Sequence, residues 1–174
     1  MYKLETYMGK DKLPILEKQL ICEEVVSASR PEKVHEMLNK YFRLSSRTEE
    51  YCFMVAMDTK CNIIGVFEVS HGSIDSSCVN PREVYMKALS CNAAGIIVAH
   101  NHPSGDPSPS SPDIAVAKRL KEAGDILGVK IFDFIICGEG CYYSFREHKR
   151  LKAVLLQERL TCKDDNAHRR NIYG

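Results

Sequence analysis

The feature that most constrains this chain of 174 residues is an apolar run, residues 95–99, that leads directly into His100-Asn101-His102. Such a run is typical of a buried strand. Alternate side chains of a strand share a face, so His100 and His102 point the same way, with Cα atoms ~6.5 Å apart. Asp113 follows at a predicted helix start. Two imidazoles and one carboxylate leave a tetrahedral Zn²⁺ one open position for water, which is typical of a catalytic site.

The segment between the histidines and Asp113 has two compatible interpretations. Residues 103–110 carry three prolines and one glycine, which makes this loop stiff. Ser110 can cap the following helix, Pro112 suits its first turn, and Asp113 complements the positive helix end. These roles explain Ser110 and Asp113 structurally, but a rigid helix start is also a suitable mount for a metal ligand. The nearby histidines favour the metal interpretation.

The spacing of these residues resembles a known metalloprotease motif. His100-x-His102, seven residues, Ser110, two residues and Asp113 match the JAMM (MPN+) motif without a gap. The flanking sequence resembles the RadC family of bacterial JAMM-domain proteins, most specifically in the string His-Asn-His-Pro-Ser-Gly-Asp-Pro. Further similar segments are residues 80–89, 92–99 and 143–147, and the similarity covers about residues 26–150.

This resemblance implies a role for each candidate site residue. His100, His102 and Asp113 are the expected Zn²⁺ ligands, and Ser110 is expected to help hold the tetrahedral intermediate. The family places its general base at the start of the first core strand, where Glu50 stands. The adjacent glutamate would face the opposite side of a strand. Three other glutamates stay open as alternatives for the base: Glu49, Glu68 and Glu83.

The implied function is that of a zinc metalloprotease of JAMM type, a hydrolase that cleaves peptide or isopeptide bonds in a protein or peptide-conjugate substrate. The alternative is a DNA repair or recombination accessory protein that binds nucleic acid without peptidase activity. A formal charge of +1 gives that alternative no electrostatic support. The helix-hairpin-helix region usual in RadC proteins is not visible either. A non-catalytic MPN scaffold is a third interpretation, but such scaffolds usually lose metal ligands that this sequence keeps.

The order of elements predicts an α/β domain. We expect an N-terminal arm over residues 1–26, a RadC-like JAMM/MPN domain over 27–160 and a flexible tail over 161–174. The resemblance implies the cytidine deaminase-like JAMM fold, with a central mixed sheet flanked by helices. The expected strands are residues 50–57, 62–69, 95–100, 130–137 and 142–145. The expected helices are one that Ser29 caps and Pro31 opens, and then residues 81–90, 111–127 and 147–158.

Cysteine usage and hydropathy indicate the cellular compartment in which we expect the protein. The eight cysteines lie largely within apolar patterns, so we expect free thiols. Cys137 and Cys141 flank Gly-Glu-Gly, which favours a hairpin turn over a second metal site. Residues 1–20 contain no sustained apolar segment, and no run approaches the ~18 residues of a membrane span. We expect a cytoplasmic protein that does not bind membranes. Exposed strand edges are compatible with a homodimer.

Overall fold

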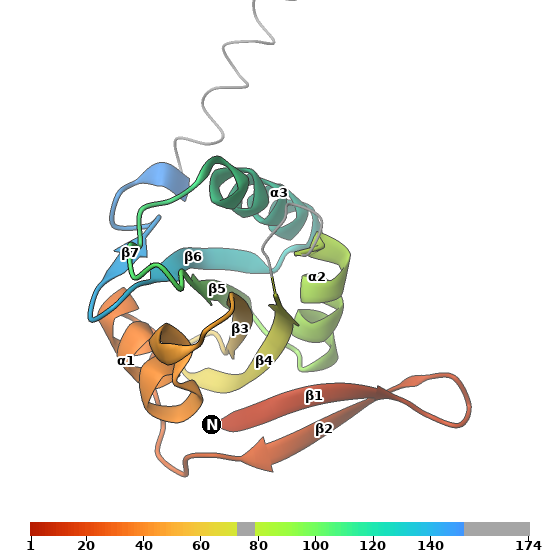
Figure 1. Cartoon of the computed structure of the whole chain (residues 1–174). Helices are drawn as coiled ribbons and strands as arrows, with labels where there is room; N and C mark the ends of the chain where they lie inside the picture. Colours follow the sequence, from red (N-terminus) through yellow and green to blue (C-terminus); the bar gives the residue numbers. More distant parts are fainter. Residues whose placement is uncertain (73–78, 152–174) are drawn as a thin grey trace, which may run out of the picture.

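The apolar run at the centre of the sequence forms the central strand of the sheet in the computed structural model, which describes residues 1–72 and 79–151. This strand, β5 (Gly95–Asn101), is buried at every residue. It pairs in antiparallel fashion with β3 (Tyr51–Met57) and in parallel fashion with β6 (Lys130–Cys137). The seven-stranded sheet has the order β2-β1-β4-β3-β5-β6-β7 (Figure 1). Its other strands are β1 (Tyr2–Met8), β2 (Pro14–Leu20), β4 (Ile63–His71) and β7 (Tyr142–Ser144).

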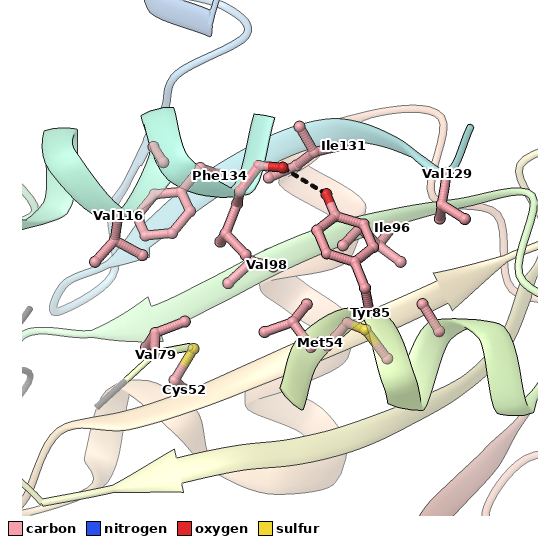
Figure 2. Packing of buried hydrophobic residues seen from close by; sticks show 14 of the residues in the cluster. Cys52, Met54, Val79, Tyr85, Ile96, Val98, Val116, Val129, Ile131 and Phe134 are labelled. Carbon is pink, nitrogen blue, oxygen red and sulfur yellow. Dashed lines mark hydrogen bonds between the residues drawn. The ribbon is translucent and has the colours of Figure 1, made fainter. Parts of the chain in front are cut away.

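Helices cover both faces of this sheet, which confirms the predicted α/β architecture. One face packs against α2 (Pro81–Ser90) and α3 (Ser111–Leu127), and the other against α1 (Pro31–Phe42). The alternation along β5 assigns its side chains to the two cores. Ile96 and Val98 point to the α2 and α3 side, as Figure 2 shows, whereas Ile97 and Ala99 point to the α1 side. His100 and Asn101, the polar residues at the end of β5, follow the same alternation.

The boundaries of α2 and α3 agree with the sequence expectations, whereas the cap of α1 differs. The helix α2 spans the predicted residues, and α3 runs from Ser111 to Leu127, followed by the C-cap Gly128, whose φ of 72° is left-handed. The prediction that Ser29 caps α1 is wrong. Arg30 is the N-cap and makes no side-chain cap bond, because Pro31 already occupies the first turn and sets the helix start one residue later.

The N-terminal arm contains strands that its mixed composition did not reveal. The strands β1 and β2 form a hairpin, and residues 2–4 of β1 pair in parallel with residues 65–67 of β4. Leu4 is buried against the main core. Gly65 permits this approach, because a Cβ there would lie 2.6 Å from Cδ1 of Leu4. All seven residues of β2 are exposed, so hydrophobic periodicity gives no signal for that strand.

The chain after β6 also differs in part from expectation. The hairpin between β6 and β7 is confirmed, with Gly138 N donating to the Cys141 carbonyl (2.9 Å). The helix predicted from residue 147 does not begin there, because residues 145–149 form turns and Lys149 has a φ of 56°. Residues 150–151 are helical, and the rest of that predicted helix and the predicted tail lie outside the described residues. The six cysteines in the described part are free thiols.

The described helices are short. The longest of them, α3, has 17 residues. No helix in residues 1–72 and 79–151 combines the length and apolar composition that a membrane span needs.

Asp133 is a buried carboxylate that organises the chain after β7. Its Oδ2 accepts from the Ser144 hydroxyl (2.6 Å), and its Oδ1 accepts from the backbone N–H groups of Phe134 (2.8 Å) and Arg146 (2.9 Å). Burial nevertheless raises the pKa of Asp133 to about 6.

We therefore expect Asp133→Asn to remove a pH dependence of stability. The carboxyl ionises near pH 3.8 when unfolded and near pH 6 when folded, so between these values the folded state holds a proton that the unfolded state has lost. Folding stability falls as pH rises through this window, by at most on the order of 3 kcal/mol. The free energy of unfolding, measured in urea, of the parent minus that of the variant should be larger at pH 4 than at pH 7. A difference independent of pH would contradict this assignment.

Gly124 in α3 lies against Tyr85 of α2, and we expect Gly124→Ala to destabilise the protein. The Tyr85 hydroxyl donates to the Leu120 carbonyl (2.7 Å), and the new methyl would meet that hydroxyl and lie 2.6 Å from the Val129 carbonyl oxygen. The destabilisation by overpacking, roughly 1–3 kcal/mol, should exceed the stabilisation of about 1 kcal/mol that the higher helix propensity of Ala gives. Urea unfolding measures the loss. Tyr85→Phe in the same chain should restore part of it; no recovery would contradict a clash at the hydroxyl.

Candidate metal centre

The end of β5 delivers the first histidine to the α3 side of the sheet. His100 continues the series of Ile96 and Val98, and its side chain is fully buried. Its ring lies 5.4 Å from that of Phe134, so the imidazole has an apolar neighbour on one side. A buried imidazole is costly when its nitrogens have no partner. Neither ring nitrogen of His100 makes a well-aligned hydrogen bond to another described residue, although its Nε2 lies 3.1 Å from Oδ1 of Asp113.

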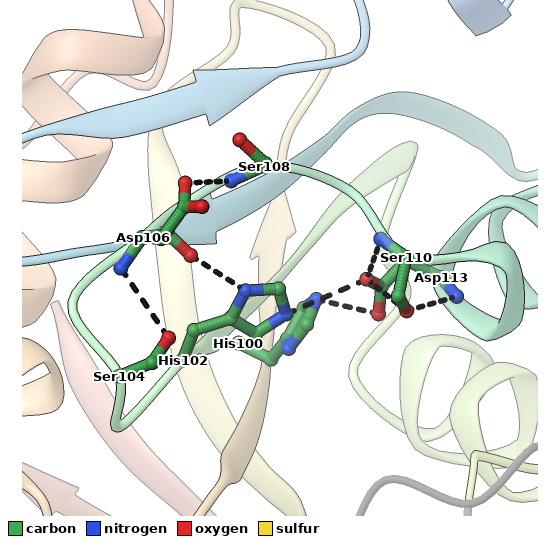
Figure 3. Close-up of polar contacts among 7 residues, drawn as sticks. All are labelled: His100, His102, Ser104, Asp106, Ser108, Ser110 and Asp113. Atoms are coloured by element: carbon green, nitrogen blue, oxygen red, sulfur yellow. Dashed lines mark hydrogen bonds and ion pairs between the residues drawn. The ribbon is translucent and has the colours of Figure 1, made fainter.

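The second histidine is oriented by the proline-rich loop that follows the strand. The backbone N–H of His102 donates to the Cys137 carbonyl of β6 (3.0 Å), which keeps the chain aligned with the sheet. Its ring Nδ1 lies 2.8 Å from the backbone carbonyl of Asp106, an arrangement in which Nδ1–H donates (Figure 3). That tautomer leaves Nε2 with a free lone pair, as a metal ligand requires. The Asp106 carboxylate itself accepts from Ser108 N (2.9 Å), which is the predicted turn bond.

The carboxylate of Asp113 is held by the start of α3. Ser110 is the N-cap, and its hydroxyl accepts from Asp113 N (3.3 Å). In return, Oδ2 of Asp113 accepts from the backbone N–H of Ser110 (2.7 Å) and from its hydroxyl (2.6 Å). This reciprocal capping box fixes the rotamer of the carboxylate. The Oδ1 atom is thereby turned toward His100.

These three side chains converge on one point. The Asp113 carboxylate lies 3.1 Å from Nε2 of His100 through Oδ1 and 3.4 Å from Nε2 of His102 through Oδ2. One ligand atom from each residue lies within 4.8 Å of the others. Burial by itself would raise the pKa of Asp113, but the two imidazoles and the Ser110 hydroxyl outweigh burial and hold that pKa well below its usual range. The carboxylate in turn raises the pKa of His102.

The donor set fits a divalent metal ion. An ion between Nε2 of His100 and the Asp113 carboxylate would satisfy a buried nitrogen that makes no well-aligned hydrogen bond to a described residue. Two imidazole nitrogens and a carboxylate oxygen suit Zn²⁺ and leave a tetrahedral ion one position for water or substrate. No other group of three such side chains with metal-binding geometry occurs in the described part of the chain.

The structure places two further predicted residues beside this cluster. Glu50 and Ser110 line a cavity of about 250 Å³ together with His102 and Asp113. Glu50 stands directly before β3, where the sequence placed it. The Ser110 hydroxyl donates to Asp113, so stabilisation of an oxyanion requires this hydroxyl to turn away from the carboxylate.

The other candidate glutamates do not line this cavity. Glu68 on β4 lies 3.1 Å from Nδ1 of His71, and Glu83 pairs with its neighbour Arg82 at 2.8 Å. Glu49 is exposed, and its backbone carbonyl accepts a hydrogen bond from the Asn101 side chain. Among the four glutamates considered, the structure brings Glu50 to the cluster.

One residue near the site escaped the sequence analysis. Asn101 is fully buried, and its amide contacts the segment that precedes β3. Strand alternation alone places it on the face opposite the histidines, where the sequence offers no visible partner. Its partners are 50 or more residues away in the chain, beyond the range of pattern analysis.

Comparison with known proteins identifies the family of this chain. Residues 28–151 match the family model described as a RadC-like JAB domain. A UPF0758 protein of Alkaliphilus oremlandii is 44% identical over 119 residues, which cover 68% of this chain and 50% of that relative. A UPF0758 protein of Pelobacter propionicus is 47% identical over 107 residues, covering 62% and 47% of the two chains. One from Thermotoga maritima is 39% identical over 127 residues, covering 69% and 57%.

The chain thus spans about half the length of the curated relatives it matches. The family match includes His100, His102 and Asp113 as well as Glu50 and Ser110. It leaves out the hairpin of β1 and β2. Because the family model matches most of the chain and the mixed α/β fold is consistent with it, this protein belongs to the RadC-like JAB domain family.

Proposed function

We propose that this protein is a zinc-dependent hydrolase that cleaves amide or isopeptide bonds. One observation carries the proposal: the buried imidazole of His100, which makes no well-aligned hydrogen bond to a described residue, converges with a second imidazole and a carboxylate beside a cavity. A site that only stabilised the fold would be expected to satisfy its buried nitrogens. His100, His102 and Asp113 would hold the ion. When bound, Zn²⁺ supplies a water of lowered pKa and polarises a carbonyl oxygen.

Glu50 is proposed as the general base. Its position in the same cavity as His102 and Asp113 supports this role. A carboxylate there can hold the proton removed from the attacking water and then deliver it to the leaving amine. Ser110 is proposed to donate its hydroxyl to the negative charge that develops on the substrate oxygen. Its backbone N–H would continue to hold Asp113 while the hydroxyl turns.

The cavity walls favour a peptide-like substrate over nucleic acid. A neighbouring cavity of about 450 Å³ shares Pro103 and Ser104 with the site, and both cavities are open to a longer chain. The carboxylates along the two cavities are Glu50, Asp113 and Glu139, and neither lining contains Lys or Arg. A bound Zn²⁺ would offset part of this negative charge, but the described walls still lack the Lys and Arg side chains that usually contact phosphates. We therefore propose a protein or peptide conjugate as the substrate.

Removal of a ligand should abolish zinc binding. We expect one equivalent of zinc in the purified parent protein and a large loss of metal in His100→Ala and Asp113→Asn, because each variant removes one of three donors. His71→Ala is the control, since His71 is exposed and pairs with Glu68. Elemental analysis measures the metal content. One equivalent retained in a His100→Ala/His102→Ala double variant would show that zinc binds elsewhere.

Substitution of the base should separate metal binding from turnover. Glu50→Gln should keep one equivalent of zinc and lose at least about 100-fold in the rate of hydrolysis, because the amide cannot take up the proton. The rate is followed with a mixture of fluorogenic peptides and lysine-linked isopeptides. Glu49→Gln is the matched control, one residue away and outside the cavity, and should keep the parent rate. Equal rates for the parent and Glu50→Gln would refute the role of Glu50.

A further inference from the structure

Asn101 stands between the two histidine ligands, but its side chain lies on the other face of the sheet. His100 follows Ile96 and Val98 toward α3, whereas Asn101 follows Ile97 and Ala99 toward α1. The amide is fully buried on that side. A buried amide needs specific partners, and its described partners belong to the segment just before β3 and to Tyr51, the first residue of that strand.

The hydrogen bonds of this amide flank Glu50 on both sides. Oδ1 of Asn101 accepts from the backbone N–H of Tyr51 (2.7 Å). Its Nδ2 donates to the carbonyl oxygens of Glu49 (3.0 Å) and Arg47 (3.4 Å). The residue before Glu50 and the residue after it are thus tied to a single side chain.

A second contact holds the same segment from the other neighbouring strand. The carbonyl of Glu50 accepts from the N–H of Gly72, directly after β4 (2.9 Å). The guanidinium of Arg47 lies 4.6 Å from the ring centre of Tyr51, and its Nε donates to the Phe42 carbonyl. The backbone of Glu50 is therefore held between β5 and β4, while its side chain lines the metal cavity.

We propose that Asn101 is a positioning residue that sets the place of Glu50 relative to the metal ligands, an inference that rests on the proposed function. The end of β5 and the residue after it supply His100 and His102 on one face and the amide on the other, so the ligands and the base are held by the same part of the sheet. Only a side chain with both a donor and an acceptor at this length meets the three backbone groups. Aspartate has the same shape but lacks the donor for the carbonyls.

The test compares Asn101→Ala with Asn62→Ala in the full chain. Asn62 donates its amide to Asp58 at the far end of the β3–β4 hairpin, so the control makes the same substitution away from the site. With Co²⁺ as the probe, both variants should bind one equivalent. Amide hydrogen exchange of residue 51 should accelerate about tenfold or more in Asn101→Ala, because its acceptor is gone, and remain at the parent rate in Asn62→Ala.

The second readout is the pH midpoint of the visible spectrum of the Co²⁺-loaded protein, which reports protonation at and beside the metal. Glu50→Gln should shift this midpoint, Asn101→Ala should shift it in the same direction, and Asn62→Ala should leave it unchanged. If Asn101→Ala does not fold, Asn101→Asp takes its place. It keeps the acceptor for Tyr51 but loses the donor, and a shift of the midpoint is again expected.

The outcomes separate the two proposals. Failure of the parent protein to bind Co²⁺ or Zn²⁺ would overturn the proposed function. A shift in Glu50→Gln without one in Asn101→Ala or Asn101→Asp would overturn the positioning role and leave the metal site standing. An unchanged midpoint in Glu50→Gln would overturn the positioning role as well, because no base would then lie beside the metal.

Discussion

The site depends on the two-residue alternation of β5 at the point where this strand leaves the core. Two apolar residues on each face of the strand pack against a different helix layer, so a one-residue shift would exchange the side chains that face the two cores and turn His100 away from α3. His100 and Asn101 then continue the alternation as polar residues that remain buried. The burial of the two cores thus fixes the orientation of these two polar side chains, and the packing of the sheet compensates the free energy needed to bury them.

The start of α3 supplies the complementary half of the cluster. Ser110 and Asp113 satisfy the first turn of the helix, and the same bonds turn one carboxylate oxygen toward His100. The same geometry of Asp113 therefore serves as a helix cap and is suitable for a metal ligand. A carboxylate locked by a capping box loses little side-chain entropy when it binds an ion, which is the condition for a preorganised ligand.

Much of the fold followed from local pattern. The apolar run of β5, the proline and glycine at the two ends of α3, and the start of α2 at Pro81 are short-range signals, and the structure has these elements where they were expected. The failures have physical causes. Ser29 is not the cap of α1 because Pro31 takes the first helical position. The strand β2 was not predicted because an edge strand exposed on both faces shows no hydrophobic alternation.

The sequence by itself determined the candidate metal-ligand types, their common face at the end of β5 and the helix start that carries the carboxylate, because each of these depends on neighbours within a few positions. Only the tertiary structure decided which glutamate reaches the cluster and what Asn101 binds. Glu50 comes to the site because β3 pairs with β5, and Asn101 meets a segment 50 or more residues away. Strand pairing sets such long-range contacts, and no periodicity within a single strand encodes its partner.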